Sequence, residues 1–208
     1  MNTRSPALTV ALVVAVCALA TASARDASGD GSVYTQLGAL HRAERLDLGS
    51  REAATLLLNG GFPAAWVDEA GGDRQPEYLR WPIPGYPLGR GFGSRDGTHL
   101  AVDITAPEGT PVQVMAPGIV GYADDGVSGY GNLVLVVHPG GWVTLYAHLS
   151  EFEVIPGQRV ERSEVIGLVG NTGVSRGPHL HFALIKRGIP VDPLEHMRDA
   201  PGQPRDVS

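Results

Sequence analysis

The stretch that decides the fold is residues 132–149, NLVLVVHPGGWVTLYAHL. Two runs rich in valine, leucine and aromatic residues flank a Pro-Gly-Gly turn at 139–141, a pattern typical of a β-hairpin. Side chains along a strand alternate between the two faces of a sheet. One face of the second strand then carries Trp142, Thr144, Tyr146 and His148, and the other carries Val143, Leu145, Ala147 and Leu149. His148 is therefore predicted to point away from the apolar set, toward solvent or a groove.

Similar runs continue on both sides of this hairpin, from about residue 88 to residue 195. LAVDI, PVQVMA, GIVGYA, VIGLVG and HLHFALI are short, rich in β-branched and apolar residues, and broken by glycine or proline. This spacing predicts an all-β domain of compact antiparallel sheet over residues 88–195. We expect residues 196–208 to be a flexible tail.

The segment before this domain has a different character. Residues 33–59 have a helical pattern, with Ser50 as the predicted N-cap of the second of two short helices and Gly60-Gly61 as its end. Residues 71–87 contain four prolines and predict a linker or an irregular entry into the next domain. Residues 25–87 are thus expected to form a helical extension and a Pro/Gly-rich linker, and the helices to pack near the groove or partly cover it.

The first 24 residues are typical of an export signal. Arg4 precedes an apolar run, and Ala22-Ser23-Ala24 has the small-x-small pattern of a signal-peptidase site. The run is shorter than the roughly 20 residues that span a bilayer, so a retained anchor is the weaker alternative. Lipidation at Cys17 is also weaker, because Val16 precedes it where a small residue is needed. Cleavage would remove the only cysteine and leave an exported chain, periplasmic or extracellular, without a thiol.

Composition excludes some partners. The formal net charge is -6 at pH 7, which argues against DNA or RNA, because binding a polyanion needs a basic surface. No second apolar stretch is long enough to span a membrane. We therefore expect neither a nucleic-acid partner nor a stable membrane span after removal of the signal.

The candidate chemistry begins with GPHLHF. His179 and His181 are two residues apart, so in a strand both imidazoles point to one face, although an ordinary surface strand could carry such a pair too. His99 and Asp103 are further candidates. In an extended strand they would be about 13 Å apart, so they could share a metal only if the chain bends near His99.

Two imidazoles and one carboxylate are typical of a catalytic zinc site, which keeps a fourth position open for water. Structural zinc sites usually use cysteine, which the processed chain would lack. The chain has no His-Glu-x-x-His motif, so the helix-borne zinc-peptidase design is excluded.

The ordered motifs resemble a known family. HLAVD, APEGTPVQVMAPGIVGYA, YGNLVLVVH, TLYAHLS, IPGQRV and IGLVGNTGVSRGPHLHFAL are similar, in this order, to the lysostaphin-type or LytM-like zinc metallopeptidases. The resemblance covers about residues 88–195 and implies a sheet of the duplicated-hybrid-motif type with a groove. It also implies one zinc ion (Zn2+) per chain, held by His99, Asp103 and His181, with His148 and His179 as the two catalytic histidines.

The sequence departs from the family pattern in three places. Ala101 stands where the family has a glycine between the first two ligands, and Ser163 stands at a common turn glycine. The loop between the Phe-Gly-x-Arg core (92–95) and His99 is short, which predicts a more open rim of the groove. The other histidines, His41, His138 and His196, match no motif and are expected on the surface.

The resemblance implies a peptidoglycan endopeptidase that hydrolyses amide bonds in stem peptides or cross-links. Two alternatives stay open at this point. One is a non-catalytic regulator of wall remodelling that uses the same groove to bind a partner, and the other is a zinc endopeptidase that acts on proteins.

Overall fold

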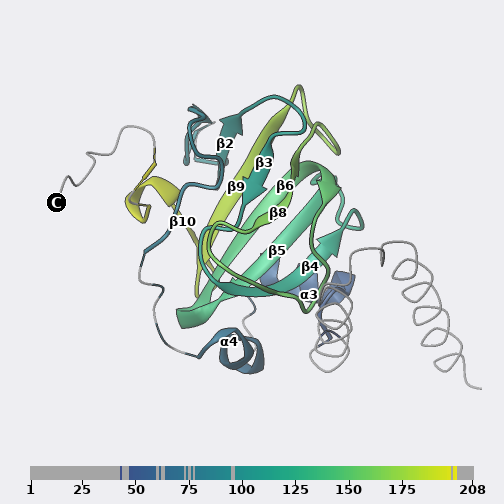
Figure 1. Cartoon of the computed structure of the whole chain (residues 1–208), viewed down its shortest axis with the longest axis vertical. Helices are drawn as coiled ribbons and strands as arrows, with labels where there is room; N and C mark the ends of the chain where they lie inside the picture. Colours follow the sequence, from purple (N-terminus) through teal and green to yellow (C-terminus); the bar gives the residue numbers. More distant parts are fainter. Residues whose placement is uncertain are drawn as a thin grey trace, which may run out of the picture. The chain divides into compact units, whose positions relative to one another are not determined.

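The computed structural model describes Ala43 and residues 47–59, 61, 64–72, 74, 76, 78–94, 97–197 and 199–200. These residues belong to one compact unit, shown in Figure 1. The predicted export signal, the first predicted helix apart from Ala43, His41 and residues 201–208 lie outside the described residues. Among the residues described, none of the helices has the length and apolar character needed to cross a membrane.

The unit is built on an antiparallel sheet, as the sequence predicts. Seven strands form its main path in the order β1 (Leu88–Arg90), β2 (Val102–Thr105), β9 (His179–Lys186), β6 (Trp142–Phe152), β5 (Asn132–His138), β4 (Gly118–Asp124) and β7 (Arg159–Val160). Three further strands join this path: β10 (Ile189–Val191) pairs with β9, β3 (Pro111–Gln113) pairs with β8, and β8 (Val165–Val169) also pairs with β6. Every one of these pairings is antiparallel.

The predicted hairpin is the β5–β6 pair at the centre of the sheet. Val137 pairs with Val143 and His138 with Trp142, across a short 3-10 turn, η1 (Pro139–Gly141). Gly140 and Gly141 have φ of 74° and 80°, a left-handed conformation that glycine adopts without strain. The predicted hairpin and its Pro-Gly-Gly turn are therefore confirmed.

Both faces of the central strands are buried, each in a different apolar cluster. On one face Tyr146 and Phe182 pack with β3, β8 and the incoming segment around Trp81. On the other face Leu145 and Ile185 pack beneath the helices. The expectation that one face of β6 is turned away from the apolar set is therefore wrong for most of the strand.

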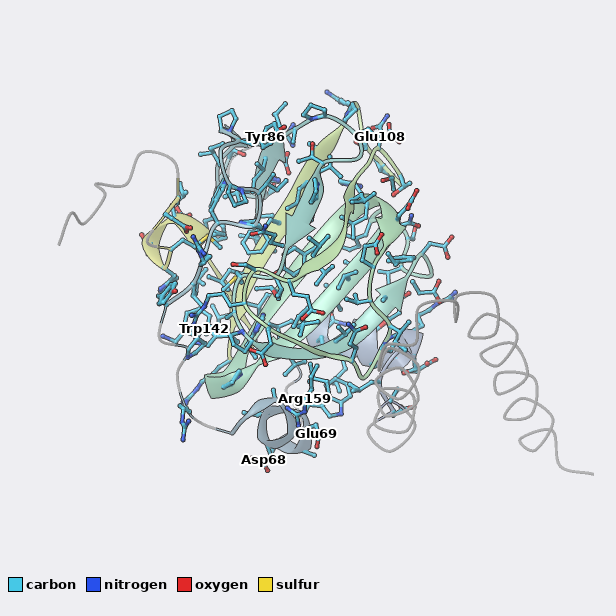
Figure 2. All side chains as sticks on the ribbon, in the orientation of Figure 1. Asp68, Glu69, Tyr86, Glu108, Trp142 and Arg159 are labelled. Atoms are coloured by element: carbon cyan, nitrogen blue, oxygen red, sulfur yellow. The ribbon has the colours of Figure 1, made fainter. Side chains whose placement is uncertain are left out.

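Two helices cover part of this second face. The helix α3 (Arg51–Leu58) begins at Ser50, whose Oγ accepts a hydrogen bond from the Ala53 N–H at 2.9 Å, as the sequence predicts. The helix α4 (Ala64–Ala70) was not anticipated from the sequence. Leu57 of α3 and Trp66 of α4 are buried against β4 and β5. Arg159 of β7 and Glu69 of α4 form a 3.1 Å ion pair, and the two labelled side chains meet beside α4 in Figure 2.

Segments expected to be loose are packed into the core. Leu79, Trp81 and Ile83, from the predicted Pro/Gly-rich linker, are at most 5% exposed. Beyond β10 and a 3-10 turn, η2 (Pro193–Glu195), Met197 and Ala200 are buried in the same cluster. Met197 and Ala200 are therefore part of the folded unit and not of a flexible tail, because their apolar side chains complete the core.

His138 corrects another expectation. It is fully buried, its Nδ1 lies 2.8 Å from the carbonyl oxygen of Pro117, and its Nε2 lies 2.7 Å from Thr144 Oγ1. Burial lowers its pKa to about 4, although its backbone hydrogen bonds act in the opposite direction. It is a neutral, hydrogen-bonded core residue and not a surface histidine. His196 is partly exposed and its ring meets Trp142 edge-on.

Candidate active site

The ligand candidates meet because β2 and β9 are neighbours. Asp103 pairs directly with His181 across the two strands, so both side chains project from the same face. His99 lies four residues before Asp103 and outside the strand, where Gly93 N–H donates to its carbonyl and its own N–H donates to Ser94. The chain therefore bends near His99, as the sequence requires if His99 and Asp103 are to meet.

These three side chains converge on one point. His181 Nδ1 lies 2.9 Å and His99 Nε2 lies 3.2 Å from Asp103 Oδ1. One ligand atom from each residue lies within 4.8 Å of the others. His99 and Asp103 are only 9% and 7% exposed. Two nitrogens and one oxygen, with a fourth coordination position left open, are the donor set of a catalytic zinc site. The three residues therefore fit this ion.

Charge around Asp103 keeps it ionised. Burial alone would raise its pKa, but the hydrogen bond from His181 and the nearby imidazoles outweigh burial and lower the pKa to about 2. Its other oxygen, Oδ2, lies 3.2 Å from Nη1 of Arg90 on β1. The contact of Arg90 with Asp103 could not be predicted from the sequence, because it depends on the β1–β2 pairing.

His148 reaches the site through a break in β6. Its φ is 64°, and the register of β6 shifts against both β5 and β8 around this residue. Its N–H donates to Tyr130 and its ring lies 4.8 Å from the ring of His179 and 5.7 Å from that of His181. After this break Leu149 packs with Tyr146 and not with Leu145. The prediction that His148 faces a groove is confirmed, but a left-handed bulge and not strand alternation brings it there.

His179 stands next to the ligand cluster at the start of β9. Its Nε2 lies 3.8 Å from Asp103 Oδ1, and its Nδ1 lies 2.8 Å from the carbonyl oxygen of Gly177. Ser175 Oγ lies 3.2 Å from the same Nδ1 and donates to Gly177. The structure thus brings together all five site residues that the resemblance implies.

Backbone carbonyls set the direction of three imidazoles. Nδ1 of His99, His148 and His179 lies 3.1, 2.8 and 2.8 Å from the carbonyl oxygens of Gly91, Thr172 and Gly177. Since a carbonyl only accepts, each Nδ1 carries the proton, and each Nε2 keeps its lone pair for the centre of the site. Such partners are typical of histidines that bind metal or transfer protons.

A groove of about 950 Å³ opens over these residues. Its walls are two loops, residues 128–130 and 174–178, together with Gly89 and Arg90 of β1. The loops are tied together, since Val174 N–H donates to Gly129, and a Cβ on Gly173 would collide with the backbone of Gly131. Thr172 accepts a hydrogen bond from Asn132 N–H and donates one to Leu149. Thr172, Ser175 and Tyr130 lie inside the family motifs, but their contacts could not be inferred from spacing.

Sequence comparisons place the site in a known family. Residues 97–193 match the family model described as Peptidase family M23. The DD-carboxypeptidase/endopeptidase Mpg of Neisseria meningitidis is 47% identical over 96 residues, which are 46% of this chain and 22% of that protein. The murein hydrolase activator NlpD of Salmonella dublin is 33% identical over 57% of this chain and 31% of that protein. The chain thus matches less than a third of the length of either relative.

Solved structures agree with the sequence matches. The antimicrobial peptidase lysostaphin from Staphylococcus simulans aligns with a TM-score of 0.52 and 30% identity, over 59% of this chain and 52% of that chain. A zinc-containing peptidase from Vibrio cholerae aligns with a TM-score of 0.51 and 31% identity, over 56% and 39%. The antiparallel sheet, the motif order and these matches agree, and residues 97–193, just under half of the chain, form a domain that matches peptidase family M23.

Proposed function

We propose that this protein is an exported, zinc-dependent endopeptidase that hydrolyses amide bonds in peptidoglycan stem peptides or cross-links. The observation that carries the proposal is the set of two imidazoles and one carboxylate with two further imidazoles beside it, all at the base of an open groove. The name of one relative supports peptidoglycan as the substrate: the peptidoglycan DD-endopeptidase ShyA of Vibrio cholerae is 34% identical over 62% of this chain and 32% of that protein.

His99, Asp103 and His181 would hold the zinc ion. When bound, zinc lowers the pKa of its water to about 7 and polarises a peptide carbonyl. The Asp103 oxygen and the two imidazole nitrogens already face one point, so binding needs little rearrangement. Arg90 holds the second oxygen of Asp103, which leaves Oδ1 directed at the ligand point.

His148 and His179 would carry out proton transfer and charge stabilisation. Each has its Nδ1 proton tied to a carbonyl, so each can accept or donate a proton only at Nε2. An Nε2–H can also donate a hydrogen bond to the oxyanion that forms when an amide carbonyl is attacked. No carboxylate other than Asp103 lines the groove among the described residues, so the imidazoles are the available general bases there.

The shape of the groove suits a thin, extended peptide. Its walls contain Gly89, Gly129 and Gly177, which have no side chains to narrow it. Glycan cleavage usually needs a pair of carboxylates flanking the glycosidic bond, and the groove offers one. The chemistry therefore favours attack on an amide.

Digestion of purified peptidoglycan tests this function. The purified protein should release fragments with new amino groups and no new reducing ends, identified by mass spectrometry, and a strong chelator should stop the release. New reducing ends appearing at the rate of wall clearing, or release that continues in chelator, would overturn the proposal. Casein digested alongside distinguishes a wall hydrolase from a general protein endopeptidase.

A regulator is the second candidate, because the relative NlpD is named a murein hydrolase activator. A regulator needs the groove but not the proton-transfer groups, and this chain retains both His148 and His179 in oriented form. A protein that cleaves nothing itself but accelerates a separate wall hydrolase would establish the regulator instead.

A further inference from the structure

The groove has a charge opposite to that of the whole chain. Apart from the histidines, the charged residues lining it are Arg90, Arg176 and Asp103, whereas the chain carries a net charge of -6. A divalent ion beside Asp103 would make the groove more positive still. The positive charge of the groove would therefore attract a substrate with free carboxylates, whereas the net negative charge of the chain would not.

Arg90 is held beside the reacting centre. Its Nη1 lies 3.2 Å from Asp103 Oδ2, while Asp103 Oδ1 faces the ligand histidines. Its side chain is 39% exposed, so guanidinium N–H groups not bonded to Asp103 remain open to the groove. A carboxylate bound there would lie near the scissile carbonyl, because the Asp103 carboxyl group joins Arg90 to the ligand point.

Arg176 also lines the groove, on the loop that orients His179. Ser175 on one side of it donates a hydrogen bond at 3.0 Å to Gly177 on the other. Val174 N–H ties the same loop to Gly129 of the neighbouring loop at 2.9 Å. The exposed guanidinium of Arg176 is thus carried on a braced loop, with no ion pair recorded for it among the described residues.

We infer that Arg90 and Arg176 form a carboxylate-binding subsite, so that the protein prefers peptides with a free carboxylate next to the scissile amide. This inference rests on the proposed function and narrows its substrate class. Arginine binds carboxylates through paired, charge-assisted hydrogen bonds. Arg176 is the residue that determines the preference, because within the described part of the chain it forms no ion pair with a carboxylate, whereas Arg90 is paired with Asp103.

A matched pair of substrates tests the inference. Cross-linked peptides from purified peptidoglycan are used as free acids and after conversion of their carboxylates to amides. We expect kcat/KM to be about tenfold or more higher for the acid form, the size of one charge-assisted hydrogen bond. Arg176→Gln should bring the ratio close to one, and Arg176→Glu should favour the amide. Arg74→Gln, which removes an equal charge at an exposed position outside the groove, should leave the ratio unchanged.

Two further measurements separate the possible failures. The affinity of the protein for both peptides, measured by calorimetry, should show the same preference whether or not the peptides are cleaved. If neither form is hydrolysed but the acid form binds more tightly, the proposed function fails and the subsite stands. Equal kcat/KM and equal affinity for both forms, or a ratio that survives Arg176→Gln, would overturn the subsite. For Arg90→Gln, both the ratio of kcat/KM for the two forms and the zinc content are measured, because Arg90 also forms an ion pair with Asp103.

Discussion

One face of the sheet has two ends with opposite properties. At one end Ala183 and Ile185 of β9 lie under the helices, and at the other end His179 and His181 of the same strand lie in the open groove. These four residues occupy every second position of a single strand, so they share one face. The backbone is the same at both ends, so the side chains decide whether the face becomes core or site.

The largest effect is expected at the open end, from loss of a ligand. His181→Ala should remove most of the zinc and lower kcat/KM by about a thousandfold or more, because the ion stabilises the transition state by several kcal/mol. Elemental analysis and peptidoglycan digestion measure the two effects. His196→Ala, outside the groove, is the control. Full zinc content in the His181 variant would contradict the ligand assignment.

Loss of the neighbouring imidazoles should separate chemistry from metal binding. His148→Ala and His179→Ala should keep the zinc and lower kcat by about a hundredfold or more, since each removes a group that transfers a proton or stabilises an oxyanion. Turnover is measured on soluble cross-linked peptides, with zinc content determined on the same samples. Unchanged turnover in both variants would remove the catalytic role of this pair.

At the covered end, a change should affect stability and not chemistry. Leu57 of α3 is 1% exposed, so Leu57→Ala should lower the free energy of unfolding by about 2–5 kcal/mol. Leu56 is the next residue in the same helix but is 42% exposed, and Leu56→Ala should have a much smaller effect. Denaturant unfolding compares the two variants. Equal effects would show that α3 does not cover the sheet as described.

The last effect is absent at neutral pH and concerns His138, a fully buried histidine outside the groove. Because its folded pKa is about 4, below its ordinary value of 6.5, the unfolded chain binds the proton first as the pH falls. His138 should therefore leave the free energy of unfolding unchanged above about pH 6.5. As the pH approaches 4, it should lower that free energy by roughly 3 kcal/mol. His138→Gln should weaken the slope of unfolding free energy against pH between 6.5 and 4. An identical slope in both proteins would contradict this assignment.

The sequence predicted the open end of the face better than the covered end. The hairpin turn, the N-cap at Ser50 and the five site residues could be predicted because each depends on a short local pattern or on the motif order. The roles of the five residues stay predictions. The burial of His138, Met197 and Ala200 could not be predicted, because it depends on which distant segments pack against them. The left-handed turn at His148 also lay beyond pattern analysis, since alternation assumes an unbroken strand.

The carbonyl partners of His99, His148 and His179 have a consequence for the evolution of this site. Each partner is a main-chain oxygen, of Gly91, Thr172 or Gly177, and no point mutation deletes a main-chain oxygen. In sites where a side-chain carboxylate orients the imidazole, one codon change removes that support. Here mutations can disturb the orientation only by moving the loops. The imidazole directions are therefore buffered against substitution, while side chains on the rim, such as Val174 and Arg176, are free to vary and to change what the groove accepts.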